Sequence, residues 1–113
     1  MEQTLKEITS YVEEYKRMDL GNGTELNSLL RDITVRLHYL ETLRADYRND
    51  YENLVHLGVK NGDSVARSVN EANVKVPEIY LLRRFMDSSY RVCDAIRSNL
   101  SYLKTEMTSL NNN

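Results

Sequence analysis

A chain of 113 residues is long enough for one domain with a moderate hydrophobic core. Apolar residues make up 41% of it and charged residues 28%, which excludes a disordered chain of low hydrophobicity. The formal net charge of −2 comes from 15 basic and 17 acidic residues, so composition alone does not indicate a polyanion as partner. We expect a single domain over residues 1–110 and a disordered polar tail at 111–113.

The sequence gives no sign of a membrane span or a secretory signal. No apolar run approaches the length that a bilayer requires, and the first residues, MEQTLKEITS, lack the basic-then-apolar order of a signal peptide. Cys93 is the only cysteine, so an intramolecular disulfide is impossible and a reducing compartment is favoured. We expect a cytoplasmic protein that contacts no membrane.

Two helices are predicted in the first half of the chain. Apolar residues three and four apart predict a first helix over about residues 2–19, and Gly21 and Gly23 interrupt the chain after it. Thr24 can cap a long second helix over about residues 25–57, which Gly58 would end. The apolar stripe of this helix consists of Leu26, Leu30, Ile33, Leu37, Leu40, Arg44, Tyr47, Tyr51 and Leu54.

Two more helices follow. Asp63 or Ser64 can cap a short helix over about residues 64–75, and Pro77 fits the first turn of a last helix over about residues 78–109. The last helix has the most regular pattern, an unbroken alternation of three and four residues that is typical of a coiled coil. Its stripe consists of Ile79, Leu82, Met86, Ser89, Cys93, Ile96, Leu100, Leu103, Met107 and Leu110.

These patterns predict an all-α fold. The two long helices have matched lengths, which favours an antiparallel coiled-coil hairpin with the first helix and the short connecting helix beside it. Arg44 interrupts the stripe of the second helix, and an antiparallel register would place it close to Ser89 and Cys93. It is either an arginine whose charged end reaches solvent or part of a polar layer that fixes the register; we favour the former.

The long helices carry more apolar surface than one hairpin can bury. On the last helix a second apolar line runs beside the stripe, and a two-helix hairpin would leave it in water. We therefore expect an oligomeric helical bundle in which copies of the chain meet. The residues that we assign to this interface are Leu81, Phe85, Val92 and Tyr102.

Patterns that would indicate catalysis are lacking. His38 and His56 have no second ligand at metal-binding spacing, and Cys93 lies within an apolar stripe. The Gly-Asn-Gly segment has no strand before it and no GK[ST] after it, as a phosphate-binding loop would. We expect no enzyme, no cofactor and no metal site.

Positive charge gathers on one side of the last helix. Its basic residues follow one shoulder of the helix, while its acidic residues lie on the other. Such a basic ridge can follow a phosphate backbone, or it can pair with acidic residues of a neighbouring helix, which we consider the more probable role. The stretch RADYRNDY (residues 44–51) is not a nucleic-acid motif by itself, because its tyrosines extend an apolar stripe and its acids lower the local potential. The basic ridge consists of Arg83, Arg84, Arg91, Arg97 and Lys104.

Residues 38–106 resemble small helical phage proteins of the recombination-mediator type. The features that carry the resemblance are the tyrosine-rich charged helix HYLETLRADYRNDYENL, the turn Gly62-Asp63-Ser64-Val65-Ala66 into a short helix, and the stretch DAIRS at residues 94–98 followed by Leu103-Lys104. The resemblance implies a phage-encoded oligomer, located in the host cytoplasm, that binds single-stranded DNA and helps to load a recombinase. The resemblance implies that the basic ridge supplies the DNA contacts.

Two functions therefore stand as hypotheses. The first is a non-enzymatic, oligomeric accessory factor that binds single-stranded DNA or recombination proteins. The second is a protein-binding module, such as a phage inhibitor of a host defence enzyme, that presents an apolar or acidic face. The predicted first helix, with five acidic residues against three basic ones, would be the acidic face.

Overall fold

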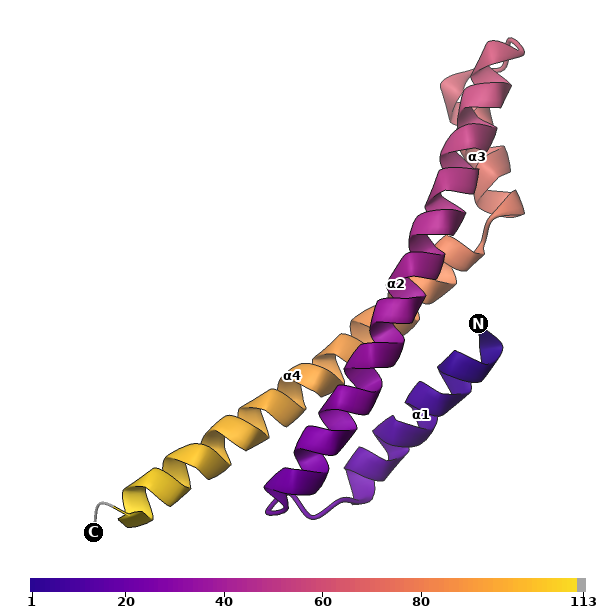
Figure 1. Ribbon diagram of the computed structural model, residues 1–113. Coiled ribbons are helices and arrows are strands. Elements are labelled where there is room, and N and C mark those ends of the chain that lie inside the picture. Colours follow the sequence, from indigo (N-terminus) through magenta and orange to yellow (C-terminus); the bar gives the residue numbers. More distant parts are fainter. Residues whose placement is uncertain (112–113) are drawn as a thin grey trace. The chain divides into compact units, whose positions relative to one another are not determined.

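The chain folds into four helices. The computed structural model describes residues 1–111, with side chains through residue 109. The helices are α1 (Glu2–Arg17), α2 (Gly23–Lys60), α3 (Val65–Lys75) and α4 (Glu78–Asn111), and no strand occurs in the described residues (Figure 1). The prediction of an all-α fold is therefore confirmed. Helix α4 includes Asn111, where the sequence predicts the start of a disordered tail; residues 112 and 113 lie outside the described part of the chain.

Short polar side chains set the helix starts. The side-chain oxygen of Asn22 accepts a hydrogen bond of 3.1 Å from the backbone N–H of Glu25, so α2 begins before Thr24, the cap that the sequence suggests. Ser64 caps α3 in the same way, accepting from the backbone N–H of Arg67 at 3.1 Å.

None of the helices, over the described residues, has an apolar stretch of the length needed to cross a bilayer.

The chain divides into two compact units. Unit 1 contains residues 1–38 together with the chain from Met86 onward, and unit 2 is Tyr39–Phe85. Each long helix contributes one part to unit 1 and another part to unit 2. The single domain over residues 1–110 stays a prediction.

In unit 1 the two long helices run antiparallel. The side chain of Thr34 hydrogen-bonds with the Cys93 thiol, and a methyl group of Leu103 lies 3.8 Å from the place that a Cβ on Gly23 would take. A residue later in α2 therefore contacts a residue earlier in α4. The two helices are antiparallel, which confirms the predicted hairpin. The core of unit 1 contains Ile8, Leu26, Leu29, Ile33, Leu37, Met86, Cys93 and Ile96.

The apolar stripe predicted for α4 is buried over its middle and exposed at its end. Leu100 and Leu103 are half-buried, but Met107 is 65% exposed, so the stripe does not continue to the end of the helix as predicted. The reason is that α2 begins at Gly23, which lies opposite Leu103. Leu110 lies outside the described side chains. The buried members of the stripe are Leu82, Met86, Ser89, Cys93 and Ile96.

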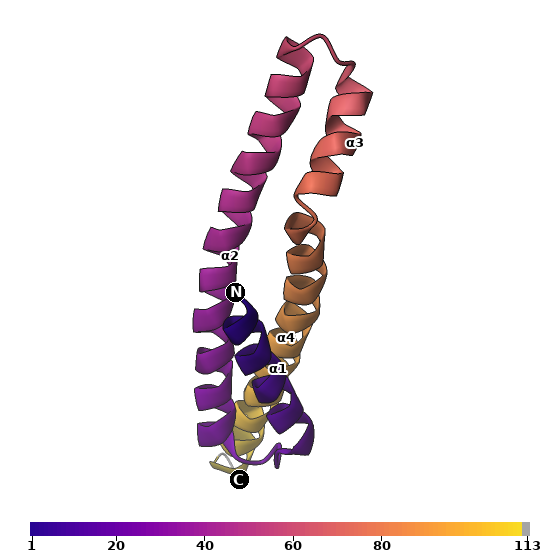
Figure 2. The same cartoon turned by 90° about the vertical axis from the view of Figure 1, so that its right-hand side faces the viewer.

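Helix α1 completes unit 1 by packing on both long helices (Figure 2). Arg36 of α2 forms an ion pair with Glu7, and its guanidinium carbon lies 4.8 Å from the ring centroid of Tyr11. On the other side, the amide of Asn99 on α4 donates a hydrogen bond of 2.7 Å to the hydroxyl of Tyr15. Polar contacts thus fix α1 at the edges of the apolar contact that Ile8 makes.

The ion pair between Glu7 and Arg36 predicts a pH dependence of stability. The hydrogen bond from Arg36 lowers the pKa of Glu7 below its ordinary value of 4.5. A lowered pKa in the folded state stabilises the fold at pH values above 4.5, and this contribution is lost as the pH falls through the folded-state pKa. We expect the melting temperature of Glu7→Gln to fall less than that of the wild type between about pH 6 and pH 3.

Glu14→Gln is the matched control for this comparison, because Glu14 is exposed on the same helix and forms no ion pair with any described residue. It should keep the wild-type pH dependence. Melting curves by circular dichroism at low salt supply the measurement. Equal falls for the wild type and Glu7→Gln would show that the ion pair does not stabilise unit 1.

Unit 2 is built around the close approach of α3 to the last turns of α2 (Figure 2). Gly58 lies inside α2 and does not end it, contrary to the sequence prediction. A Cβ on Gly58 would lie 2.5 Å from Oγ and 3.0 Å from Cβ of Ser68, so only glycine allows the helices this contact. The turn that follows contains Gly62 with φ 96°, a left-handed conformation that favours glycine. The buried residues of unit 2 are Leu40, Ser68, Ala72, Val76 and Leu82.

The predicted register of the hairpin, with Arg44 close to Ser89 and Cys93, is wrong. The residue of α2 that contacts Cys93 is Thr34 and not Arg44. Arg44 instead lines a pocket together with Ile79 and Arg83. The cause is that α3 packs against the last turns of α2, so that α4 begins beside an earlier part of α2. Arg44 therefore belongs to no polar layer with Ser89 and Cys93.

Candidate nucleic-acid interface

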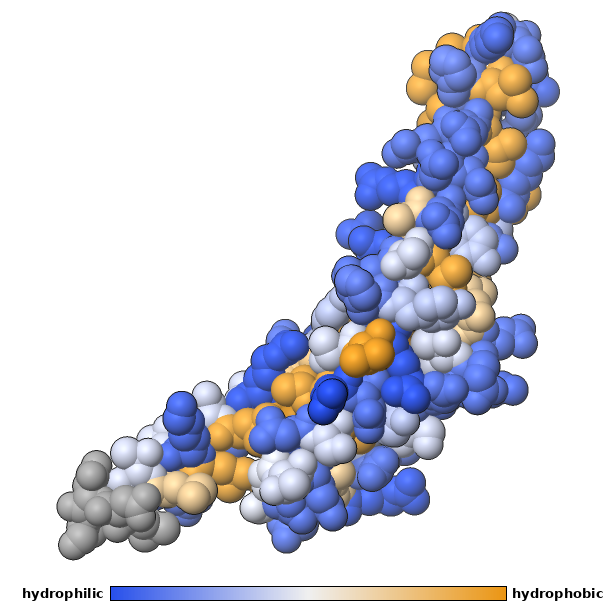
Figure 3. Space-filling model, in the orientation of Figure 1, coloured by the Kyte–Doolittle hydropathy of each residue, from blue (hydrophilic) through white to orange (hydrophobic). Residues whose placement is uncertain are grey.

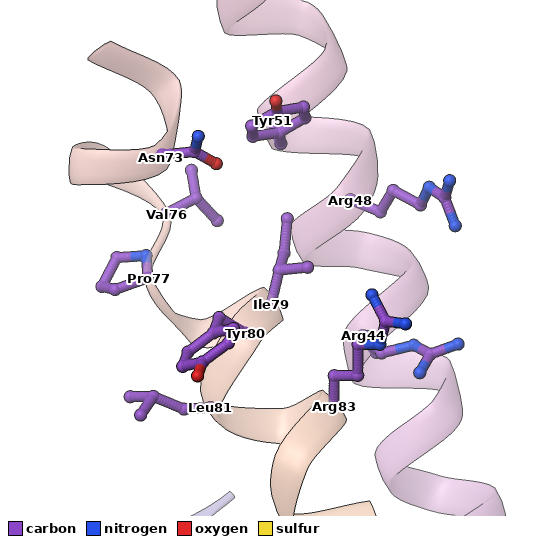
Figure 4. A pocket seen from close by; sticks show the side chains of 10 residues that line it. All are labelled: Arg44, Arg48, Tyr51, Asn73, Val76, Pro77, Ile79, Tyr80, Leu81 and Arg83. Carbon is purple, nitrogen blue, oxygen red and sulfur yellow. The ribbon is translucent and has the colours of Figure 1, made fainter. Parts of the chain in front are cut away.

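Unit 2 contains a pocket of about 920 Å³ that combines arginines, tyrosines and an apolar floor (Figure 4). This volume lies in the range of small-molecule sites, about 300–1,000 Å³. Arg83 extends from α4 toward Arg44 on α2 (Figure 4). The lining residues are Arg44, Arg48, Tyr51, Asn73, Val76, Pro77, Ile79, Tyr80, Leu81 and Arg83.

Helical spacing explains why these side chains meet. Arg44, Arg48 and Tyr51 are four and three residues apart on α2, so they share one face of that helix. Tyr80 and Arg83 are three residues apart in the first turns of α4. The turn at Gly62 reverses the chain, so that α3 and then the start of α4 run back beside α2 (Figure 2), which brings the two sets to one pocket.

Two of the three arginines that line the pocket form no ion pair with a described acid. Arg48 pairs with Glu52 at 3.6 Å, and both side chains are largely exposed. No described acidic side chain forms an ion pair with Arg44 or Arg83, and none lines the pocket. Two guanidinium groups held near one another without a carboxylate favour the binding of an anion.

An aromatic ring lies beside these charges. Tyr80 is 62% exposed, and the guanidinium carbon of Arg84 lies 5.9 Å from its ring centroid. Tyr51 is half-buried at the other side of the pocket. The arrangement can therefore hold an anion and an aromatic ring at once.

Glu78 is a further feature of this part of unit 2. It stands in the first turn of α4, where the positive end of the helix dipole favours a carboxylate. Its Oε2 atom is buried and accepts no hydrogen bond from any described residue. It does not line the pocket, although Pro77 and Ile79 on either side of it do.

The basic ridge is exposed along α4, and its members differ in their surroundings. Arg83 and Arg84 belong to unit 2, whereas Arg91, Arg97 and Lys104 belong to unit 1. Arg97 pairs with Asp94 at 3.1 Å, so its charge is partly neutralised. Arg91 and Lys104 form no ion pair with described residues.

The residues predicted for an interface between copies fall into two groups. Leu81 and Tyr102 are 63% and 67% exposed, as an interface would require. Phe85 and Val92 are half-buried, so other parts of the chain already cover much of them. Figure 3 shows apolar surface along α4, and also at the end of unit 2 where α2 turns into α3.

Features that would support catalysis are not found in the described residues. They contain no group of three or more histidine, cysteine or acidic side chains placed to hold a metal ion. The Cys93 thiol is buried, and this burial raises its pKa, which reduces the nucleophilic thiolate form.

Sequence reasoning missed the pocket although it considered most of its residues. RADYRNDY contains Arg44, Arg48 and Tyr51. They form a pocket only together with Tyr80 and Arg83 from the start of α4. The signal that could have found the site is the absence of acids at four-residue spacing from Arg44 toward the C-terminus, together with the pair Arg83-Arg84.

Comparisons with protein-family models, with curated proteins and with solved structures find no significant match to the chain. The resemblance to recombination mediators therefore stays a hypothesis that rests on the residues quoted for it.

Proposed function

We propose that the chain is a non-enzymatic accessory factor that binds single-stranded nucleic acid, as the resemblance to recombination mediators implies. The observation that carries the proposal is the pocket of unit 2, where Arg44 and Arg83 have no acidic partner among the described residues and where the exposed ring of Tyr80 also lines the wall. Arginines that neutralise phosphates and rings that stack on bases are the common elements of single-strand binding.

The mechanism is electrostatic capture of the strand. Each phosphate that an arginine neutralises releases condensed counterions, which favours binding at low salt. The net charge of −2 does not prevent this, because no acidic residue lines the pocket and the electrostatic potential near the site steers the approach of the strand. Arg91 and Lys104 of unit 1 add further unpaired positive charges that a strand can contact.

Salt dependence tests the proposal. We expect the wild type to bind a labelled oligothymidylate, with the logarithm of the binding constant falling linearly as the logarithm of salt concentration rises. Arg84→Glu combined with Arg91→Glu should weaken binding, and it should reduce the slope by about 1.4, since each contact with a single strand contributes about 0.7. Fluorescence anisotropy at several salt concentrations measures both quantities.

A charge-matched control separates local contacts from net charge. Arg31→Glu combined with Arg67→Glu changes the net charge equally, but Arg31 lies on α2 outside the ridge and Arg67 is already paired with Glu71 at 3.1 Å. This variant should keep most of the affinity and the wild-type slope. No binding by the wild type at low salt would end the proposal.

We also propose that copies of the chain associate. The exposed Leu81 and Tyr102 support this, because an isolated copy leaves them in water. Several copies would increase affinity for a long strand by holding neighbouring sites together. Light scattering should give a mass that is a multiple of 13.2 kDa; a mass of one chain at micromolar concentration would contradict association.

A protein-binding module is the second candidate, favoured by the apolar end of unit 2. Leu57, Val59 and Val65 are 53%, 42% and 63% exposed around the α2–α3 turn, as Figure 3 shows for that end. The acidic face suggested for α1 has less support, because Glu7 and Glu13 are paired with basic residues. Failure of the wild type to bind any oligonucleotide would favour this candidate.

A further inference from the structure

The two arginines of the unit 2 pocket are the starting point. Arg44 and Arg83 come from different helices and reach the same pocket, and no described acid is paired with either of them. Guanidinium groups bind phosphate through paired N–H donors, and two of them from different elements can hold one phosphate from two sides. The pocket therefore favours one phosphate group at the Arg44–Arg83 pair.

The ring of Tyr80 defines what can be attached to that phosphate. Tyr80 lies three residues before Arg83 on α4, so the two residues occupy adjacent positions on the surface of that helix. It is 62% exposed and lines the same pocket, which leaves area for a flat aromatic group. Arg84 at 5.9 Å from the ring centroid adds positive charge beside it.

From this geometry we infer that the unit 2 pocket holds one nucleotide unit of a single strand. The phosphate lies between Arg44 and Arg83, and the adjoining base stacks on Tyr80. A base paired within a duplex presents only its edge, so the site selects unpaired strands. The inference rests on the proposed function and adds that the pocket takes one nucleotide unit, with its phosphate at the arginine pair and its base on Tyr80.

The test compares variants of the full chain in binding to a labelled oligothymidylate. Arg44→Ala combined with Arg83→Ala should weaken binding by about 10-fold or more, because each loses a charged hydrogen bond. Tyr80→Leu should weaken it by about 5-fold or more, whereas Tyr80→Phe keeps the ring and should bind like the wild type. Arg31→Ala combined with Arg67→Ala removes two positive charges outside the pocket and should have a small effect.

Each of the following results would contradict the inference in whole or in part. If the variant of Arg44 and Arg83 bound normally and mutation of Arg91 and Lys104 abolished binding, the unit 2 pocket would not be the binding site. The proposed function would still hold. No oligonucleotide binding by the wild type would overturn both. Binding of thymidine monophosphate without binding of the oligonucleotide would show that a free nucleotide is the ligand. If inorganic phosphate competed as well as thymidine monophosphate, the proposed contact between the base and Tyr80 would be contradicted.

Two controls keep the comparison interpretable. A duplex of the same length should compete at least several times more weakly than the single strand, since its bases are already stacked. Arg44→Lys keeps the charge but not the paired donors, so it should recover part of the affinity that Arg44→Ala loses. Melting curves of all variants show whether unit 2 remains folded.

Discussion

Leu82→Ala is expected to lower the free energy of unfolding by about 2–5 kcal/mol, because the substitution leaves a cavity in the core of unit 2. Leu82 is 2% exposed, whereas its neighbour Leu81 is 63% exposed on the same helix. Leu81→Ala is therefore a control with the same chemical change at the next position. At a protein concentration too low for copies to associate, it should alter stability by no more than about 0.5 kcal/mol.

Urea unfolding followed by circular dichroism measures this difference. Small and equal losses for Leu81→Ala and Leu82→Ala would contradict the burial of Leu82 and the position of α4 within unit 2. A large loss for Leu81→Ala that disappears on dilution would instead place Leu81 in a contact between copies. The pair of variants thus also tests the proposed association.

Gly58→Ala is expected to destabilise unit 2 although alanine is the better helix former. The helix propensity favours alanine by about 1 kcal/mol, whereas overpacking costs about 1–3 kcal/mol. The added Cβ would lie 2.5 Å from Oγ and 3.0 Å from Cβ of Ser68. Rotating the hydroxyl relieves only the first of these contacts, so α3 must move away from α2.

A second substitution shows whether this contact is the cause. Ser68→Gly removes both atoms that the new Cβ would meet, so Gly58→Ala should cost less in that background than in the wild type. Gly23→Ala is the control, because the nearest atom to its new Cβ is a methyl group of Leu103 at an ordinary 3.8 Å. Equal effects of Gly58→Ala in both backgrounds would contradict the close contact between α2 and α3.

The alternation of three and four residues predicted which side of α4 is buried, from Leu82 to Ile96, because a helix that packs along one line needs this period. On α2 the same reasoning chose Leu30, whereas the structure buries Leu29 to 3% exposure and leaves Leu30 half-buried. Helix α1 explains this, since it packs on α2 as well and widens the buried face beyond one stripe.

The register and the pocket could not be predicted from the pattern. A stripe repeated every three or four residues fits its partner equally well after a shift of one heptad, so periodicity does not fix the position along the axis. The close packing of Ser68 against Gly58 decides where α3 lies, and so where α4 begins. That shift of α4 brings Arg83 to Arg44 and creates the site.

Arginine side-chain NMR gives the most direct test of the Arg44–Arg83 site. Nε–Hε signals, assigned by single substitutions, would be followed as unlabelled oligothymidylate is added at low salt. We expect the signals of Arg44 and Arg83 to move most, and those of Arg31 and Arg67 to stay in place. Saturable shifts confined to other arginines, or no shifts at all, would contradict strand binding in the pocket of unit 2.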